Sequence, residues 1–597
     1  MYTHGGGSLV SLASSVRTVR PPAFVHIHCL QTTCPSSDCP TVPQYIAVAF
    51  RTRRSYHRHT VSHPIAQGKA VTANGSARKP EVKGGDVTWS ICAMSSQAVD
   101  CNALEATTSI EDITEDKLNR DILRRLKNDE LSALWLCRPD LSGDNKDYEH
   151  HEDYELGSSR ELDWLGHFTK KSTRLEKFGI LGDDAFRNCS GHSVDRFLGN
   201  LGKCNHIKKM IFYCTDLAEI IYKLGPAMKN NSITHFTVER CYLGVPEATF
   251  LFNTFRDMNS LEALDIGGDE EEEGPSNLND GEMAGCIPSL AACTGMRSLT
   301  LAYLNLSTNS CAALRCVFPR MATLRKLVLQ ANSLDDDCTR LLAQGLSDCK
   351  QIQSLNLCDN RISDDGLDVL VQRLPTSVDA LDLARNDITL ARHVLRLRFR
   401  VLDISGNSLC PGGTRVIAVS LANPECRLES LNVRGCNIGD EETATLADGL
   451  RNNQRLTHMS LGNNNITERG WNAFSPILCD VSSINATYNS NHTLHLGGNG
   501  ADIPENVRLL VSLNEGENKS RVAANKILQA HRHLDMKTLF GRELGLLPYV
   551  VAWLDHFAKS RPGLKLSSIF EFVRAMPMKV TNWVVGNAKG EKRKLNS

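Results

Sequence analysis

A short apolar outline recurs along most of this 597-residue chain, and it constrains the fold more than any other feature. In the stretch IQSLNLCDNRI, at 352–362, leucine-type residues alternate with polar ones and are followed by Asn and a further apolar residue. The commonest interval between repeats of this outline is 28 residues, from starts at 175, 207, 233, 261, 296, 324, 352, 378, 399, 428, 456 and, more weakly, 484. A near-constant period of this length predicts a stack of similar units rather than one compact core.

Each unit predicts one short strand and one helix. Alternating apolar and polar residues place the leucines on one face of a strand. Segments between the strands, such as DDCTRLLAQGLSDCK, have apolar residues three and four positions apart, which is typical of a helix. We therefore expect an α/β solenoid, a horseshoe with a parallel sheet on its concave side and helices outside.

Two intervals differ from the common one and predict local changes. An acidic insertion, GGDEEEEGPSNLNDGE at 267–282, accounts for the 35-residue interval that begins at 261. The 21-residue interval after Val378 leaves no room for a full helix, so the outer layer should be thinner there.

Composition and periodicity divide the chain into six parts. The leader lacks sustained periodicity, and its first 94 residues carry ten Lys or Arg against three acidic residues, which is typical of disorder. Next, Ile113, Leu118, Ile122, Leu123 and Leu126 indicate an amphipathic capping helix that leads into a first repeat strand. The expected parts are the leader 1–105, the capping helix and first strand 106–137, an acidic inserted loop 138–160, the repeats 161–500, a C-terminal helical cap 501–585 and a basic tail 586–597.

A polar residue at a fixed position after each strand predicts an internal hydrogen-bond ladder. Backbone groups that turn into the coil need partners, and an Asn side chain offers both a donor and an acceptor. Cys436, Cys241 and Thr215 hold the same position in other units. We assign these positions a structural role, and the Asn members are Asn332, Asn360, Asn386, Asn407 and Asn464.

The 28-residue unit with the LxxLxLxxNxI outline resembles the ribonuclease-inhibitor-like class of leucine-rich repeats. That class is shared with sensor regions of NOD-like receptors and with Ran GTPase-activating proteins. The flanking stretches 163–180, 482–495 and 564–580 are similar to an expanded algal family of uncharacterised repeat proteins of this class. The resemblance implies a horseshoe fold and a binding role, and it carries over no functional residue.

Composition and motifs favour no catalytic or nucleic-acid function. Lys and Arg total 67 against 68 for Asp and Glu, so no global charge points to nucleic acid or an anionic membrane. The sequence has no P-loop and no GxSxG or kinase signature. The cluster His26, His28, Cys29, Cys34 and Cys39 departs from the usual zinc-knuckle spacing. We expect no catalytic residue, no metal and no cofactor.

The 21 cysteines are scattered without a paired framework, which favours reduced thiols and a cytoplasmic location. A nuclear location and organelle import through the leader are the alternatives. No apolar run reaches the length of about 20 residues that a membrane helix needs, so we expect no membrane span. We expect a monomer.

The preferred function is a non-catalytic scaffold or receptor that binds a protein partner on its concave sheet. On that face Asp382 and Asp403 should be neighbours on adjacent strands, where like charges repel. Arg385 and Arg434 lie close to them along the strands, and Tyr303 and Asp359 lie on nearby coils; we predict that these six residues contribute to the partner site. The competing interpretation is that they are solvated polar positions with local Arg compensation.

An activator of a small GTPase, of the Ran GTPase-activating type, is the alternative function. Proteins of that type end in an acidic tail, whereas this chain ends in aromatic-rich helices and the basic stretch KGEKRKLNS. Single-turnover GTP hydrolysis with a panel of small GTPases distinguishes the two functions.

Overall fold

The computed structural model describes residues 100–137, 153–182, 184–218, 220–268, 278–391, 398–498, 503–516, 518–531 and residue 556. Backbone contacts divide the chain between Cys92 and Ala93, and all described residues belong to the second unit. Residues 1–99 of the expected leader 1–105, with the candidate zinc ligands, lie outside the described residues, and so do the basic tail and the aromatic residues expected in the C-terminal cap, Trp553, Phe557, Phe570, Phe572 and Trp583. The last residues of the expected disordered leader are ordered and contain the helix Cys101–Leu104, so its boundary was placed too late.

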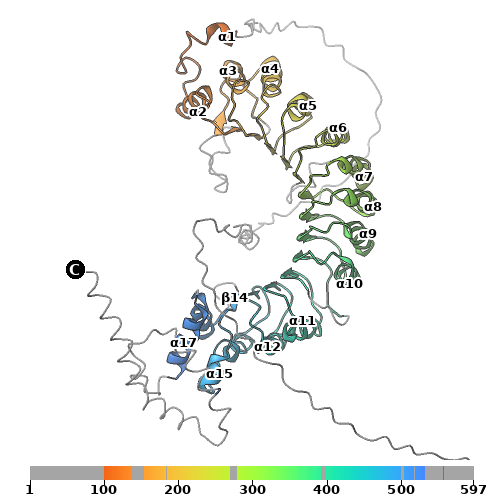
Figure 1. Ribbon diagram of the computed structural model, residues 1–597, viewed down its shortest axis with the longest axis vertical. Coiled ribbons are helices and arrows are strands. Elements are labelled where there is room, and N and C mark those ends of the chain that lie inside the picture. Colours follow the sequence, from red (N-terminus) through yellow and green to blue (C-terminus); the bar gives the residue numbers. More distant parts are fainter. Residues whose placement is uncertain are drawn as a thin grey trace, which may run out of the picture. The chain divides into compact units, whose positions relative to one another are not determined.

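The strands of the described coils pair in parallel in one sheet, because each coil returns the chain to the same side (Figure 1). Neighbours in the sheet are neighbours in sequence, except that β1 lies between β2 and β3. The central leucines lie in register from coil to coil, as Leu355, Leu381 and Leu402 do. The strands are β1 Ala133–Cys137, β2 Asp153–Glu155, β3 Lys177–Leu181, β4 Lys209–Tyr213, β5 His235–Glu239, β6 Ala263–Gly267, β7 Ser298–Ala302, β8 Lys326–Val328, β9 Ser354–Asn356, β10 Ala380–Asp382, β11 Val401–Asp403, β12 Ser430–Asn432, β13 His458–Ser460 and β14 His495–Gly497.

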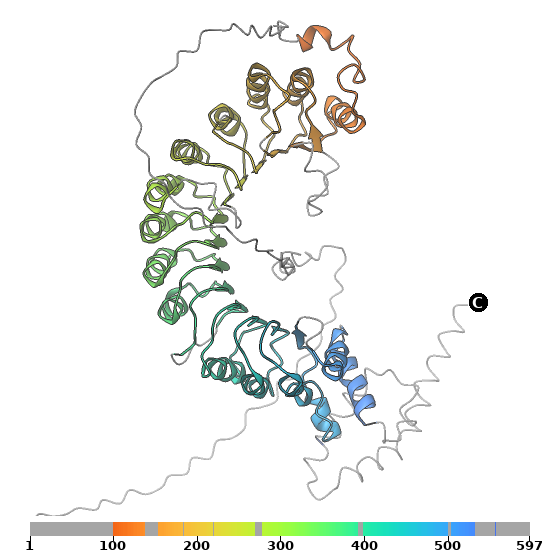
Figure 2. The same cartoon turned by 180° about the vertical axis from the view of Figure 1, so that it is seen from behind.

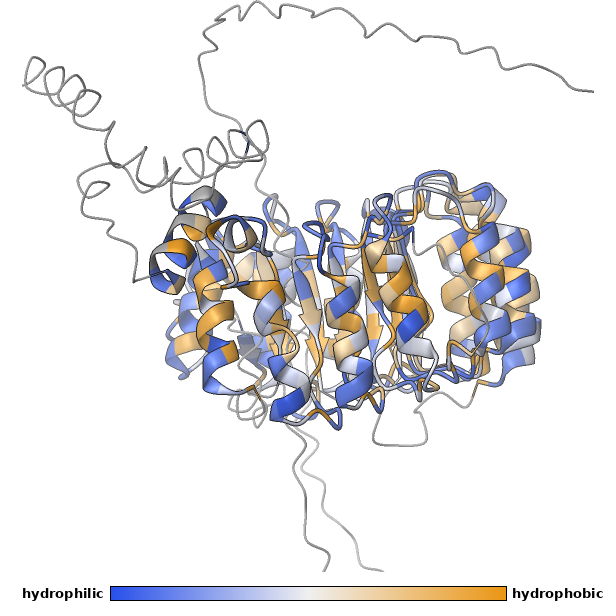
Figure 3. Cartoon of the chain, turned by 90° about the horizontal axis from the view of Figure 1, so that it is seen from below, coloured by the Kyte–Doolittle hydropathy of each residue, from blue (hydrophilic) through white to orange (hydrophobic). Residues whose placement is uncertain are grey.

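Helices form the layer outside the sheet, and the view from behind shows the same two layers (Figure 2). Coloured by hydropathy, the helices carry hydrophobic and hydrophilic residues side by side, and hydrophobic stretches of the strands lie behind them (Figure 3). The helices are α1 Cys101–Leu104, α2 Lys117–Lys127, α3 Ser159–Thr169, α4 Gly191–Leu201, α5 Ile221–Asn230, α6 Val245–Arg256, α7 Asp280–Cys286, α8 Thr308–Val317, α9 Asp336–Leu346, α10 Asp364–Arg373, α11 Gly413–Ala422, α12 Asp440–Gly449, α13 Glu468–Asn472, α14 Ser475–Leu478, α15 Ile484–Tyr488, α16 Glu505–Ser512 and α17 Lys519–Ala530, with short 3-10 helices η3 Ile287–Ala292, η4 Phe318–Arg320 and η5 Leu513–Glu515.

One continuous cluster of buried side chains fills the space between the two layers. It runs from Cys101 to Val507, so no coil has a core of its own. Burial of the leucine-type residues supplies the main stabilisation, at about 25 cal/mol for each Å² of apolar surface removed from water. The predicted fold, a horseshoe of strand and helix coils with helices at both ends, is confirmed.

Three local expectations were wrong. The weak outline at 484 does not start a strand: Ser483 accepts a hydrogen bond from the Ala486 backbone and begins α15, and the last strand among the described residues is β14. Part of the expected loop 138–160 is β2, which pairs with β1; residues 138–152 are not described. In the capping helix α2, Leu118 is 47% exposed.

The acidic insertion is shorter than expected at its C-terminal end. Its centre, 269–277, is not described, but its last residues already belong to α7. Asn279 and Glu282 form a reciprocal capping box, which stabilises the first turn of that helix. The sequence DGE at 280–282 was therefore assigned to the insertion although it is helical.

The thinner outer layer expected after Val378 stays a prediction, because residues 392–397, between β10 and β11, are not described. No helix stands between β10 and β11 in the described residues there, 383–391 and 398–400. Instead, the Arg398 guanidinium donates hydrogen bonds to the carbonyls of Leu374 at 2.8 Å, Pro375 at 3.1 Å and Val371 at 3.4 Å. One side chain thus supplies donors to three carbonyls around the end of α10, where helix carbonyls lack partners within the helix.

A second polar ladder, absent from our sequence analysis, joins the outer layer. The first residue of several helices is an Asp whose carboxylate accepts backbone N–H groups from the start of the next coil's outer segment. Asp336, for example, accepts from the N–H groups of Ser363 and Gly366 and from the Ser363 hydroxyl. The members are Asp280, Asp336, Asp364 and Asp440.

Candidate functional site

The predicted Asn ladder lies inside the coils and links each coil to the one before it. Asn407 is fully buried; its Oδ1 accepts the N–H groups of Asn386 and Ile388, and its Nδ2 donates to the carbonyls of Leu383 and Ile404. Asn332, Asn360, Asn386 and Asn464 make equivalent bonds. These side chains are committed to backbone groups and are not available to a ligand.

Cys436, Cys241 and Thr215 occupy the same position with fewer bonds. The Cys436 thiol donates to the Ile404 carbonyl at 3.2 Å, and the Thr215 hydroxyl donates to the Ile180 carbonyl at 3.2 Å. Neither side chain can replace the two donors and one acceptor of an Asn amide. The ladder is therefore weaker in the early coils, at Thr215 and Cys241, and at Cys436, which lies between Asn407 and Asn464.

A column of residues with positive φ precedes the ladder along the edge of the concave sheet. Glycine tolerates this conformation, whereas other residues adopt it at a cost. Gly406 and Gly435 fill two of these positions. The others carry side chains: Cys214, Arg240, Tyr303, Ala331, Asp359, Arg385 and Asn463, with φ between 49° and 60°. Three predicted partner residues, Tyr303, Asp359 and Arg385, thus share one special backbone position, which the sequence pattern did not reveal.

A second column lies in the middle of the concave face, at the last residue of each strand from β9 to β12. Its members are Asn356, Asp382, Asp403 and Asn432 in successive coils, with Asp382 directly opposite Asp403. The side-chain oxygen of each accepts the backbone N–H two residues further on, at 2.8 to 3.2 Å. Asn and Asp therefore make the same local turn, and the turn does not require a charge.

The two carboxylates have different surroundings. Asp403 also accepts from the Ser405 hydroxyl at 2.6 Å and from the Asn432 amide at 2.7 Å. Asp382 accepts only from the Ala384 N–H, and no basic side chain in the described region forms an ion pair with either carboxylate within 4.0 Å. Burial, followed by the nearby Asp403 charge, raises the pKa of Asp382 to about 7.

The structure only partly brings the six predicted partner residues together. Arg385 forms an ion pair with Asp359 of the preceding coil at 3.3 Å, and not with the central carboxylates. Arg434 follows β12, where its N–H donates to the Asn432 side chain. Tyr303 lies two coils before Asp359, and its hydroxyl accepts from the Gln330 amide. The structure thus places Asp382 and Asp403 opposite each other as a central pair. The ion pair of Arg385 and Asp359 lies one position row away, and Tyr303 is two coils distant from it.

A second acidic pair on the concave face was not selected from the sequence. Burial, then the Glu239 charge, raises the pKa of Asp265 on β6 to about 6. Burial also raises the pKa of Glu239 on β5. Asp265 occupies the same strand position as Asp382, so a comparison of neighbouring coils at that position would have found it.

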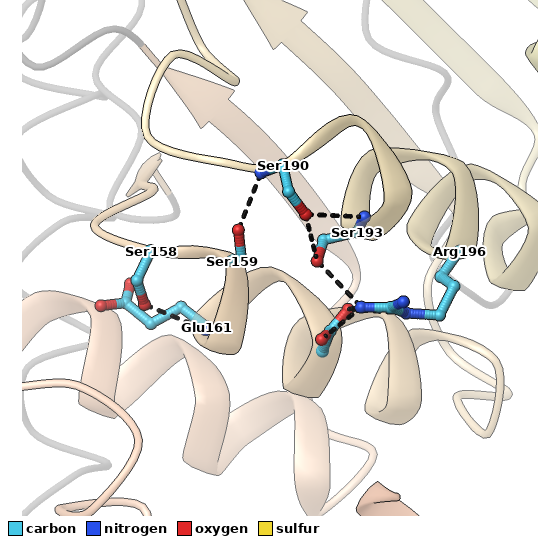
Figure 4. A network of polar contacts seen from close by, with 7 residues as sticks. Ser158, Ser159, Glu161, Ser190, Ser193 and Arg196 are labelled. Carbon is cyan, nitrogen blue, oxygen red and sulfur yellow. Dashed lines mark hydrogen bonds and ion pairs between the residues drawn. The ribbon is translucent and has the colours of Figure 1, made fainter. Parts of the chain in front are cut away.

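A polar cavity near the N-terminal end was weighed as another site. It has a volume of about 740 Å³ and is lined mainly by acidic and amide side chains around the starts of α2 and α3. Its acids have structural tasks: Asp116 caps α2, and Glu161 accepts from Tyr154 and Gly157. Beside it, Ser158, Ser159, Ser190, Ser193 and Arg196 continue a polar network from α3 to α4 (Figure 4).

The described residues offer neither a metal site nor a membrane-spanning helix. No group of three or more His, Cys, Asp or Glu side chains there could hold a metal ion. No helix in the described part is long and apolar enough to cross a membrane.

Comparisons with known proteins are consistent with this architecture. A family model described as Leucine Rich repeat matches residues 349–371 and 426–441. The NACHT, LRR and PYD domains-containing protein 14 of Mus musculus is 26% identical over 303 residues, which are 47% of this chain and 28% of that protein. The ribonuclease inhibitor of Mus musculus is 30% identical over 212 residues, which are 34% of this chain and 41% of the inhibitor. The chain thus covers less than half the length of either relative.

A solved structure of an internalin from Listeria monocytogenes covers 61% of this chain and 95% of its own, with 15% identity and a TM-score of 0.37. A TM-score at this level supports no argument about geometry. The matched family model, the ribonuclease inhibitor relatives and the coils described above agree with one another. The coils of this chain are therefore leucine-rich repeats, and they are similar to those of the ribonuclease inhibitor.

Proposed function

We propose that this chain is a non-catalytic scaffold that binds a protein partner on the concave face of its sheet, with Asp382 and Asp403 at the centre of the contact. One observation carries the proposal. Asn356 and Asn432 make the same turn on either side of the two aspartates, so the fold does not need the negative charges. The charges cost stability in the free protein, because like charges directly opposite each other repel.

The chemistry of the pair favours a partner that presents a lysine or arginine side chain. A cation between the two carboxylates relieves their repulsion and provides charge-assisted hydrogen bonds. Asp382 has capacity for such bonds, since a carboxylate has about four acceptor sites. The adjoining ion pair of Arg385 with Asp359 supplies both signs of charge at the rim of the proposed contact. Charges at a rim set the orientation of the partner more than the affinity of the complex.

The test is the double variant D382N/D403N in the full chain. The amides keep the local turns, so the fold should be at least as stable as the wild type at pH 8. Binding of a partner recovered with wild-type protein, measured as a dissociation constant at fixed salt, should weaken at least about tenfold, which corresponds to losing one charge-assisted contact.

A matched control is D337N, which removes a charge from the exposed surface of α9. It should change neither stability nor partner affinity. If D382N/D403N binds the partner as tightly as D337N does, the central pair is not the binding site.

A further inference from the structure

The seam between the last coil and the C-terminal elements η5 and α17 contains buried basic groups. Lys526 of α17 is fully buried, and its Nζ donates to the carbonyls of Leu478 at 2.6 Å and Asn491 at 2.8 Å. These carbonyls stand at the two ends of the segment that contains α15. One lysine therefore fastens α17 to both ends of that segment.

His492 lies in the same seam and is held in one neutral form. Its Nε2 bonds to the Tyr488 carbonyl at 2.9 Å, and because a carbonyl can only accept, Nε2 carries the proton. Nδ1 is then the bare nitrogen, and it is buried without a hydrogen-bond partner in the structure. A proton added to Nδ1 would create a buried cation with no acceptor, which is strongly unfavourable.

A stacked pair of histidines lies near Lys519 of α17. His458 on β13 and His495 on β14 are in register, and their rings stack with centroids 5.2 Å apart. Thr457 donates its only hydroxyl proton to the Glu429 carbonyl, so its oxygen accepts from Nδ1–H of His458. That leaves Nε2 of His458 as the nitrogen that takes up a proton.

Positive charges around the seam further disfavour the protonated form of the three histidines. Lys519 lies near His458, His492 and His495, and Lys526 lies near His492. Glu515, beside His495, and the buried Cys479 thiol, beside Lys526, are the acidic groups that face them. Burial lowers the pKa of Lys526 to about 7 and that of His492 to about 4, and it also lowers the pKa of His458 and His495.

We propose that this seam is an acid-sensitive latch: at neutral pH it holds η5 and α17 against the last coil, and protonation of His492 and of the stacked histidines releases them. Release breaks the two Lys526 bonds and the bond from the Asn514 amide to the Leu494 carbonyl. It uncovers the terminal coil of the sheet at β14.

The sign of the pH effect follows from linkage. A histidine whose pKa is lower when the latch is closed binds more protons when it is open, so acid favours the open form. With a pKa of about 4 closed and the ordinary value near 6.5 open, His492 alone should raise the opening equilibrium about 30-fold between pH 8 and pH 5. The stacked pair should add to this.

Backbone hydrogen exchange of the full chain tests the proposal. After correction for the intrinsic pH dependence of exchange, protection of 519–531 should fall at least about 30-fold from pH 8 to pH 5. Protection of 354–432, in the middle of the repeats, should not change. Unchanged protection of 519–531 would overturn the proposal.

The variant H492Q separates the histidine from other acid effects. A glutamine amide can still donate to the Tyr488 carbonyl but does not titrate, so H492Q should lose most of the pH response while keeping wild-type protection at pH 8. An equal loss of protection in H492Q and wild type at pH 5 contradicts the role of His492. Exchange at the imidazole C2 position of wild-type His492 gives its pKa without any variant, and an ordinary value near 6.5 would also contradict it.

Discussion

At the scale of single residues, a polar side chain in this fold is explained first by the backbone groups it satisfies. Asp382 ends β10 and Asn407 follows β11 on the next coil. The two residues differ in how many backbone groups their side chains satisfy. Every polar atom of the Asn407 amide is used inside the coil, whereas one oxygen of Asp382 serves its turn and the charge serves nothing in the fold. The first is structural, and the second is a candidate for binding.

Replacing Asn407 with Ala should strongly destabilise the repeats. The change leaves the N–H groups of Asn386 and Ile388 and two carbonyls without partners in a buried site, so the free energy of unfolding should fall by about 3–4 kcal/mol. Urea unfolding followed by circular dichroism measures it. The neighbouring exposed Ser408→Ala should change stability by less than about 0.5 kcal/mol. Equal, small effects of both changes would show that the ladder contributes little.

Replacing Asp382 with Asn should stabilise the protein in a pH-dependent way. Because the pKa of Asp382 is raised in the folded state, its proton is bound more tightly there, and stability is lost as pH rises from about 4 to about 7. The difference in unfolding free energy between D382N and wild type should therefore grow from near zero at pH 4 to about 1–2 kcal/mol at pH 8. Urea titrations at both pH values check this, and a difference that does not depend on pH contradicts it.

At the scale of elements, side chains from one coil satisfy backbone groups at the helix ends of a neighbouring coil. The Asp ladder does so at helix starts, and Arg398 does so at the end of α10. In the Asp ladder, the Asp at the start of one helix accepts backbone N–H groups at the start of the next coil's outer segment. Hydrogen bonds from Ser310 and Ser307 outweigh the burial of Asp280 and lower its pKa to about 2. Its contribution should thus be complete above pH 4 and be lost as pH falls towards 2.

Asp336 and Asp337 provide a matched pair for testing the ladder. Asp336→Ala removes the acceptor for the N–H groups of Ser363 and Gly366 and should lower the unfolding free energy by about 1–2 kcal/mol. Asp337 is exposed and pairs only with Arg340 on the same helix, so Asp337→Ala should cost no more than about 0.5 kcal/mol. Urea unfolding of the two variants side by side decides whether the ladder stabilises the outer layer.

Arg398 should matter more than an ordinary surface arginine. Arg398→Ala leaves three carbonyls around the end of α10 without their donor and should lower the unfolding free energy by about 2–4 kcal/mol. Arg398→Lys should recover only part, because an ammonium lacks the planar fork. Arg400→Ala, which breaks an exposed ion pair with Glu429, is the control and should cost less than about 1 kcal/mol.

At the scale of the whole molecule, one core shared by all described coils makes the ends as important as the middle. A terminal coil exposes its apolar interior unless another element covers it. Val507, Val522 and Ile527 of the C-terminal helices are buried in the described structure. The described helices α16 and α17 therefore belong to the same structural unit as the repeats, and residues 532–555 and 557–585 of the expected cap are not described.

Deleting 501–597 should cause aggregation or a large fall in melting temperature, because the apolar end of the last coil meets water. Light scattering and thermal unfolding measure the two outcomes. Deleting 1–94 is the matched control and should leave the melting temperature unchanged, since that composition predicts disorder. A monomeric 1–500 chain with wild-type stability would show that the C-terminal helices form an independent domain.

The sequence alone determined the period, the alternation of leucines and the positions of the Asn residues after the strands. Each of these depends on spacing within one unit, where the chemistry of a short segment sets the local structure. The tertiary structure alone decided what depends on contact between coils. It set the positive φ of Arg385, the unneeded charge of Asp382 beside Asp403, the Asp ladder and the buried Lys526, because burial and cross-coil partners exist only once the units are stacked.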